Sequence, residues 1–259
     1  MTPARLIVFV HGFNGKAVKT WHEFAYSGDV SEWWQQADML FIGYDSLSEH
    51  PSDTAAWIRD RLGVFFPGGL PEYLRKSDVV LRERATDPYR ELYLVGHSLG
   101  GVVIRLLMLQ LAHAWRAAAR LDVNAIPPEV MRATVRLFSP ATAGFQLGGF
   151  KRLPLSALLH AWILVKSPPA LRILDYRTNE ALKNLRRETE SIANAHGSEV
   201  DGLRAYILWA RPELVVEHDD YNTDFVQESL IPVRDHSAVC KPRWGYGEPR
   251  RFVETGRQQ

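Results

Sequence analysis

Residues 92–107 read LYLVGHSLGGVVIRLL and place two apolar runs on either side of a short polar corner. The first run ends at Val95 and the second begins at Val102, with three glycines, a histidine and a serine between them. A short apolar run rich in β-branched and aromatic residues is typical of a strand buried on both faces. The longer apolar pattern over 99–119 is typical of a buried helix. The stretch therefore predicts a strand, a tight corner and a core helix.

The same alternation of short apolar runs and longer helical patterns continues along the chain. Strands are predicted at 5–10, 38–44, 91–96, 133–139 and 203–210, with a weaker one at 229–233. Helices are predicted at 52–66, starting on a Ser52 or Asp53 cap, and at 71–86, 99–119 and 178–195. This order predicts an α/β fold with a mostly parallel central sheet and helices on both faces, in a single domain over 1–259.

One segment, residues 146–174, interrupts the alternation. It holds an apolar stretch between Lys151-Arg152 and Lys166 that is too short to span a bilayer. It could be a helix packed on the sheet, or a lid over the site that favours medium or long acyl chains. A third possibility is peripheral membrane contact through 150–166, with the basic ends at the headgroups.

Composition limits the class of protein. The chain has 259 residues, 46% of them hydrophobic, and a net charge of +1 from 31 basic and 30 acidic residues. This balance gives no reason to expect nucleic acid as a partner. The single cysteine, Cys240, cannot form an internal disulfide, which fits a reducing compartment. With no secretory signal or membrane-spanning segment in the sequence, a cytoplasmic location is expected.

The corner at Gly96-His97-Ser98-Leu99-Gly100 fits the pattern G-x-S-x-G. A serine between strand and helix can hold its hydroxyl out of the sheet, and the glycines remove Cβ atoms that would clash there. The first N–H groups of the following helix favour negative charge at the same place. These features predict that Ser98 is a nucleophile. The alternative is that Ser98 only caps the helix.

A second loop, HGFNG at 11–15, closes the first predicted strand. Acyl transfer needs backbone donors around the oxyanion that develops on the substrate. Leu99, which follows the nucleophile, can supply one N–H group, and Phe13 is the expected source of the other. The imidazole in this loop is expected to be satisfied by backbone atoms. Support for the loop is expected from His11, Gly12 and Asn14.

The two motifs VFVHGFNG and LVGHSLGG resemble those of the α/β-hydrolase superfamily. More narrowly, they resemble lipase-like serine esterases related to GPI inositol-deacylases. Residues 138–148, FSPATAGFQLG, resemble a strand-end turn of those proteins, and residues 235–242, DHSAVCKP, resemble their C-terminal catalytic-histidine loop. The resemblance implies a Ser–acid–His triad in that chain order, with no obligatory cofactor.

The candidates for the base and the acid follow from the Ser–acid–His chain order and from where each residue lies relative to the predicted strands. His236 comes after the last predicted strand and matches the histidine loop, while His218 is the alternative base. Glu213 follows the fifth strand and stands where the resembling family often has aspartate. Asp219 and Asp220 are the alternative acids, and the remaining carboxylates of that loop, Glu217 and Asp224, are expected to be solvated.

These residues predict a serine esterase or lipase that acts on a small-molecule or lipid ester. Acyl transfer or thioester cleavage could use the same triad, because the acceptor pocket decides between them. A catalytically inactive α/β-hydrolase scaffold that binds a lipid or a protein is an alternative of another class. No Cys/His cluster has zinc spacing and the acidic loop lacks the calcium pattern, so no metal is expected.

Overall fold

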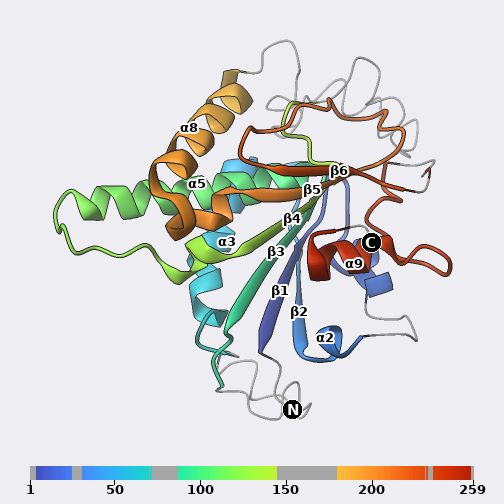
Figure 1. The fold of residues 1–259 in the computed structure, drawn as a ribbon, viewed down its shortest axis with the longest axis horizontal. Coiled ribbons are helices and arrows are strands. Elements are labelled where there is room, and N and C mark those ends of the chain that lie inside the picture. The colour runs from blue at the N-terminus through green and yellow to red at the C-terminus, as the bar shows by residue number, and fades with distance from the viewer. Residues whose placement is uncertain are drawn as a thin grey trace.

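The computed structural model describes residues 4–24, 31–69, 71, 87–144, 180–230, 232 and 236–257. Within them, one six-stranded sheet has the order β2-β1-β3-β4-β5-β6, and every neighbouring pair is parallel (Figure 1). The strands are β1 (Arg5–Val10), β2 (Ala37–Ile42), β3 (Glu91–His97), β4 (Thr134–Phe138), β5 (Ala205–Trp209) and β6 (Phe225–Glu228).

Helices cover both faces of the sheet. The α-helices are α1 (Ala17–Trp21), α2 (Glu32–Gln35), α3 (Pro51–Phe65), α5 (Leu99–Ala119), α8 (Glu180–His196) and α9 (Glu248–Thr255). Short 3₁₀ helices are η1 (His22–Phe24), η2 (Glu129–Arg132) and η5 (Gly197–Leu203). The helices α3, α5 and α8 lie on one side of the sheet, and α2 and α9 lie on the other (Figure 1).

Each face has its own apolar core. Along β1, Leu6 and Val8 belong to the cluster shared with α3, α5 and α8, whereas Ile7 and Phe9 belong to the cluster shared with α9. This alternation follows from the two-residue period of a strand. Because both faces are buried, the inner strands β1, β3, β4 and β5 are apolar almost throughout. The predicted fold class, a parallel sheet with helices on both faces, is confirmed.

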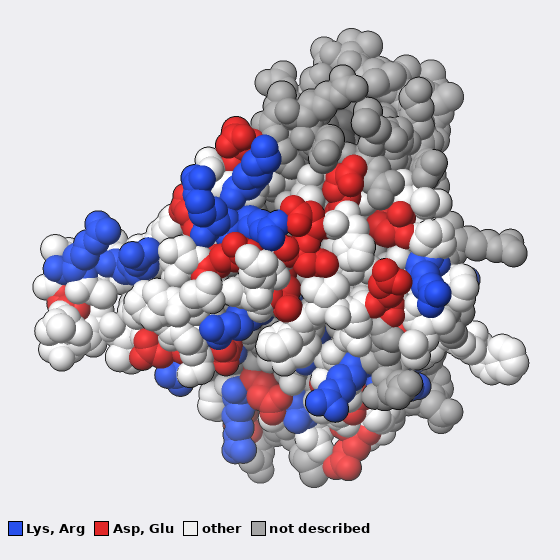
Figure 2. Space-filling model, turned by 45° about the horizontal axis from the view of Figure 1, so that its top comes forward, with Lys and Arg blue, Asp and Glu red and all other residues white. Residues whose placement is uncertain are grey.

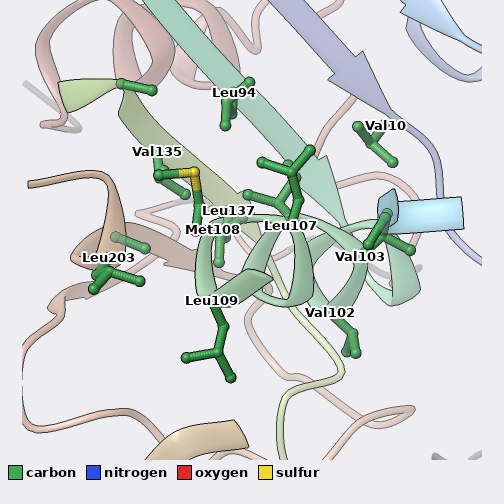
Figure 3. Close-up of a cluster of buried hydrophobic side chains, with 14 of the residues drawn as sticks. Val10, Leu94, Val102, Val103, Leu107, Met108, Leu109, Val135, Leu137 and Leu203 are labelled. Carbon is green, nitrogen blue, oxygen red and sulfur yellow. The ribbon is translucent and has the colours of Figure 1, made fainter. Parts of the chain in front are cut away.

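The helix α5 fills the larger core (Figure 3). Its Val103 and Leu107 are 0% and 1% exposed and pack in one cluster with Leu94 of β3 and Leu137 of β4. By length and composition α5 could cross a membrane, but 50% of its apolar window is buried within the fold, as in a core helix. The corner at Ser98 is thus followed by a helix embedded in the core.

Two predicted boundaries are wrong. Among the described residues the last strand is β6, Phe225–Glu228, and residues 229, 230 and 232 of the predicted run 229–233 lie outside any strand. As the edge strand β6 keeps its side chains largely exposed, so it lacks the apolar run that marks an inner strand. The N-cap of α3 is His50, two or three residues before the predicted Ser52 or Asp53, because the His50 imidazole accepts the Ser52 N–H at 3.2 Å. The predicted helix 71–86 and the segment 146–174 lie outside the described residues, apart from residue 71.

Charges of both signs are interspersed on the face of the molecule shown in Figure 2. Lys and Arg side chains alternate there with Asp and Glu, in line with the near-neutral composition. A surface of this kind offers no extended field of one sign over that face. Electrostatic attraction of a polyanion is therefore not a property of the face in view.

Candidate active site

The carboxyl ends of the strands bring the candidate residues to one edge of the sheet. In open parallel sheets, ligands bind at this edge, where the strand order reverses. The reversal here lies at β1, which has β2 on one side and β3 on the other. Ser98 directly follows β3, and the loop from His11 follows β1. Glu213 lies beyond the end of β5, and His236 lies beyond the end of β6.

The backbone at Ser98 has the strained geometry that the corner predicts. Its φ of 53° and ψ of −121° are unusual for a residue with a side chain. A Cβ on Gly100 would lie 2.2 Å from the Val10 carbonyl oxygen, so only glycine lets the start of α5 approach β1 this closely. The Ser98 side chain makes no capping hydrogen bond to α5. The interpretation of Ser98 as a mere helix cap is therefore wrong.

The loop after β1 lies directly against this corner. A Cβ on Gly12 would come within 2.9 Å of the Ser98 Cβ, which explains why this position holds glycine. Among the described residues, neither the Phe13 N–H nor the Leu99 N–H donates a hydrogen bond. Leu99 is buried and Phe13 is half-buried, and buried backbone donors are almost always paired in folded proteins. Within the part of the chain that the structure describes, these two amides are thus available to donate hydrogen bonds to an oxyanion.

The His11 imidazole supports the loop and has no free ring nitrogen. Its Nδ1 lies 2.8 Å from the Gly12 carbonyl oxygen, and its Nε2 lies 3.4 Å from the Tyr44 amide nitrogen. The ring stacks on Tyr44 with a centroid distance of 4.3 Å. The Nδ1–H tautomer satisfies both contacts, and burial lowers the pKa of His11. Asn14 adds to the support through its backbone, since its N–H donates to Ser46 Oγ at 2.8 Å.

His236 and Glu213 form a buried pair. The His236 Nδ1 lies 2.9 Å from Glu213 Oε2 and 3.0 Å from Oε1, and the two side chains are only 3% and 4% exposed. A carboxylate accepts hydrogen bonds, so Nδ1 carries the proton. Within the described residues the buried Nε2 has no partner. In the neutral ring this nitrogen presents a lone pair, as a general base requires.

Several donors keep Glu213 ionised. Burial raises the pKa of this carboxyl, but hydrogen bonds from His236, Ser139 and the Val215 N–H outweigh burial and hold the pKa below its usual value. The Val215 N–H donates at 2.9 Å and the Val216 N–H at 3.3 Å, both to Oε1. The extra methylene of glutamate thus does not prevent contact with the ring. Glu213 is a charged acceptor fixed by its own loop.

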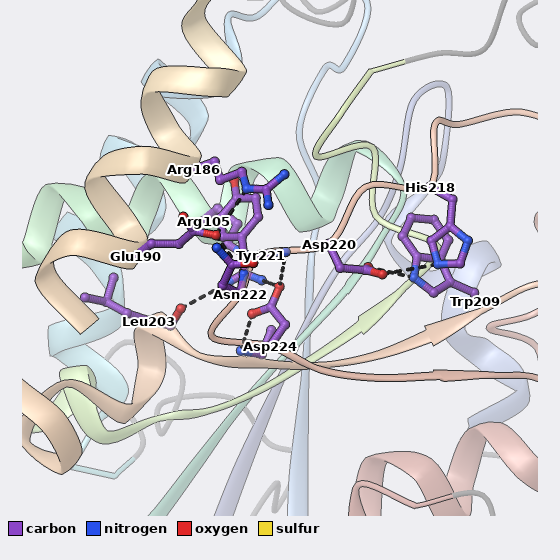
Figure 4. Close-up of polar contacts among 11 residues, drawn as sticks. Arg105, Arg186, Glu190, Leu203, Trp209, His218, Asp220, Tyr221, Asn222 and Asp224 are labelled. Carbon is purple, nitrogen blue, oxygen red and sulfur yellow. Dashed lines mark hydrogen bonds and ion pairs between the residues drawn. The ribbon is translucent and has the colours of Figure 1, made fainter. Parts of the chain in front are cut away.

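The alternative acids and the alternative base make other contacts, of which Figure 4 shows that of Asp220 with His218. Asp219 accepts a hydrogen bond from Arg186 of α8 at 2.6 Å. Asp220 accepts from Trp209 Nε1 at 2.8 Å and pairs with His218 at 3.2 Å. The three side chains that were alternatives for the acid and the base therefore make separate contacts. Of the carboxylates considered, the structure brings Glu213 to His236.

Asp224 is buried, so the prediction that it is solvated is wrong. It forms an ion pair with Arg105, and the two side chains are 0% and 1% exposed. Arg105 also donates to the Leu203 carbonyl at 2.8 Å, and Asp224 accepts the Ala205 N–H at 3.0 Å. The guanidinium lies over the Tyr221 ring, 4.3 Å from its centroid (Figure 4). Arg105, the one of the two arginines in the helix 99–119 that stands among its apolar residues, was the available signal.

Two further site residues escaped the sequence analysis. Ser139 has a φ of 38°, contributes to holding Glu213 ionised, and accepts the Ala210 N–H at 2.9 Å. His97 precedes Ser98 in the chain, and its Nε2 lies 3.0 Å from the His236 carbonyl oxygen. Both are polar residues at buried strand ends, and that position was the signal. In the part of the chain that the structure describes, no cluster of three His, Cys, Asp or Glu could hold a metal ion.

The sheet order and the layers define an α/β-hydrolase fold. Lipase BlEst2 of Bacillus licheniformis, in its mature form, aligns with a TM-score of 0.53 at 18% identity, over 92% of this chain and 87% of that chain. A lipase-esterase related protein from Clostridium acetobutylicum ATCC 824 has a TM-score of 0.47 at 13% identity, with 97% and 92% covered. The monoacylglycerol lipase of Paleococcus ferrophilus has 0.43 at 14%, with 96% and 92% covered. No protein-family model and no curated protein matches the sequence.

Proposed function

We propose that this protein is a serine hydrolase that cleaves a carboxylic ester through Ser98, His236 and Glu213. The observation that carries the proposal is the buried pair in which Glu213 binds His236 Nδ1 and leaves Nε2 without a partner among the described residues. A protonated Nδ1 leaves Nε2 free to take a proton from a hydroxyl. The strained serine at the same sheet edge is the hydroxyl available to it.

Acylation follows from these positions. Ser98 Oγ attacks the ester carbonyl carbon while its proton moves to His236 Nε2, and the carbonyl oxygen becomes an oxyanion. The N–H groups of Phe13 and Leu99 stabilise that charge. Glu213 stabilises the imidazolium without taking its proton. When the intermediate collapses, the bond to the leaving alcohol breaks and the imidazolium protonates the alcohol oxygen.

Deacylation repeats the same transfers with water. Water gives one proton to His236 Nε2 and attacks the acyl carbon, and the oxyanion forms again between the same two amides. Collapse breaks the bond to Ser98 Oγ, which regains its proton from the imidazolium. The carboxylic acid leaves and the site returns to its starting state. The cycle consumes one ester and one water and needs no cofactor.

The substrate class is proposed from likeness as well as from geometry. Solved structures with this fold include proteins described as a lipase, a monoacylglycerol lipase and a thioesterase. The motifs around Phe13 and Ser98 support the narrower relation to lipase-like serine esterases related to GPI inositol-deacylases. We propose a lipid or small-molecule ester as substrate. A preference for medium or long acyl chains rests on the apolar segment 146–174, which lies outside the described residues.

A fluorophosphonate probe tests the proposal directly, because it reacts with an activated serine whatever the natural substrate is. We expect stoichiometric labelling of the wild type and no labelling of the Ser98→Ala variant, with circular dichroism showing that both are folded. Folded wild type that takes up no probe would favour the inactive binding module. A chain-length series of p-nitrophenyl esters then tests the acyl preference, and equal or faster hydrolysis of the acetate would contradict it.

A further inference from the structure

His97 lies next to the nucleophile but contacts the other end of the proposed triad. Its Nε2 is 3.0 Å from the backbone carbonyl oxygen of His236, and the two rings are 4.7 Å apart between centroids. A carbonyl oxygen only accepts, so His97 Nε2 carries the proton and donates. This hydrogen bond joins positions 139 residues apart. It ties the corner of Ser98 to the loop of His236.

The surroundings of His97 keep it a neutral donor. Burial, followed by the proximity of His236, lowers the pKa of His97 to about 3. The residue is 6% exposed, so its ring has little room to turn. The loop after β1 closes the other side, since a Cβ on Gly12 would lie 3.2 Å from His97 Nδ1. The imidazole is therefore held in one tautomer and one orientation.

The hydrogen bond to Glu213 alone does not fix the position of the His236 ring. The bond to Glu213 sets one edge of the imidazole, but the backbone that carries the ring must also be held. A misplacement of about 1 Å at a reacting group can cost on the order of 100-fold in rate. His97, which directly precedes Ser98, donates a hydrogen bond to the backbone carbonyl of His236. It thus couples the position of the base to the position of the serine.

We propose that His97 is a positioning residue: its Nε2–H holds the His236 backbone so that the imidazole faces Ser98. The inference rests on the proposed function, because it concerns the geometry of the same triad. It assigns to the x position of G-x-S-x-G a role that the motif itself does not state. His97 takes no part in proton transfer.

A donor-retaining and a donor-free variant test this role. Glutamine can place an amide N–H near the position of an imidazole Nε2–H, whereas phenylalanine fills the ring volume without a donor. We expect the second-order rate of fluorophosphonate labelling to fall about 10- to 100-fold in His97→Phe and to recover largely in His97→Gln. With p-nitrophenyl esters the loss should fall on kcat and leave KM nearly unchanged.

Nuclear magnetic resonance supplies a readout that a purely structural role would not move. The Nδ1–H proton of His236, bonded to Glu213, should give a downfield signal that broadens or shifts in His97→Phe and stays in His97→Gln. Equal losses in both variants, or none in His97→Phe, would overturn the positioning role. If the wild type takes up no probe, the proposed function fails instead, so the two failures are distinguishable.

Discussion

Glu213 and Asp224 both lie in the connection from β5 to β6, and both side chains are almost fully buried. Each carboxylate pairs with a basic side chain and also accepts backbone N–H groups. The partners differ: Glu213 binds an imidazole, and Asp224 binds a guanidinium. Imidazole can gain and lose a proton near neutral pH, whereas guanidinium stays charged. A buried carboxylate can therefore support proton transfer at Glu213 and stabilise the fold at Asp224.

The largest expected effect is the loss of activity in a Glu213→Gln variant. Glu213→Gln removes the charge that stabilises an imidazolium, and the new amide can donate to His236 Nδ1. That would favour the tautomer with its proton on Nε2, which cannot accept one from Ser98. We expect the rate of ester hydrolysis to fall by about 10⁴-fold, the scale known for such a tautomer change. The rate is measured from the release of p-nitrophenol from p-nitrophenyl esters. A loss of rate below about 10-fold would contradict the assignment of Glu213 as the acid.

The second effect is on stability, at Asp224. Asp224→Asn leaves the Arg105 guanidinium buried without a counter-ion, while the amide oxygen can still accept the Ala205 N–H. Removing one partner of a buried pair costs about 3–5 kcal/mol in free energy of unfolding. Urea unfolding followed by circular dichroism measures the loss. The probe labelling rate per folded molecule should be unchanged, which contrasts with Glu213→Gln.

The matched control is the double variant Arg105→Met with Asp224→Asn. It removes the unpaired charge as well as its partner, so it should recover much of the stability lost in the single variant. A double variant that is as unstable as Asp224→Asn would show that the charge itself is not the cause. A single variant that loses labelling without losing stability would place Asp224 in the chemistry after all.

The comparison also shows what the sequence can and cannot predict. The strained corner at Ser98 could be predicted because it is a local property: glycine spacing between an apolar strand and an apolar helix is visible in a few residues. Glu213 and His236 needed chain order and resemblance in addition. Asp224 could not be predicted, because an aspartate in an acidic run looks solvated until its partner, 119 positions away, is seen.

The edge of the sheet gives a second example. The four inner strands are buried on both faces and show as apolar runs, and all four could be located from the sequence, together with the edge strand β2. β6 carries exposed Phe225 and Val226 and has a neighbouring strand on one side only. Its four residues are defined by pairing with β5, which no local pattern reveals. The sequence therefore predicts the strand in the apolar run that follows, at 229–233.

A smaller effect concerns pH. The folded pKa of Glu213 lies below its ordinary value, so the ionised carboxylate stabilises the native state. That contribution is present above the unfolded pKa of about 4.3 and is lost as the pH falls through the lower folded pKa. Between about pH 5 and 3, the wild type should thus lose more stability than Glu213→Gln. Parallel curves of unfolding free energy against pH would contradict this.

The smallest effect is expected at Asp219, the alternative acid that the structure pairs with Arg186. Their side chains are 59% and 28% exposed, so water screens the pair. Asp219→Asn should change the free energy of unfolding by less than about 1 kcal/mol. The labelling rate should stay at the wild-type value, because no contact joins Asp219 to His236 among the described residues. A large loss of labelling in this variant would instead make Asp219 the triad acid and remove the contrast between Glu213 and the other carboxylates of the loop.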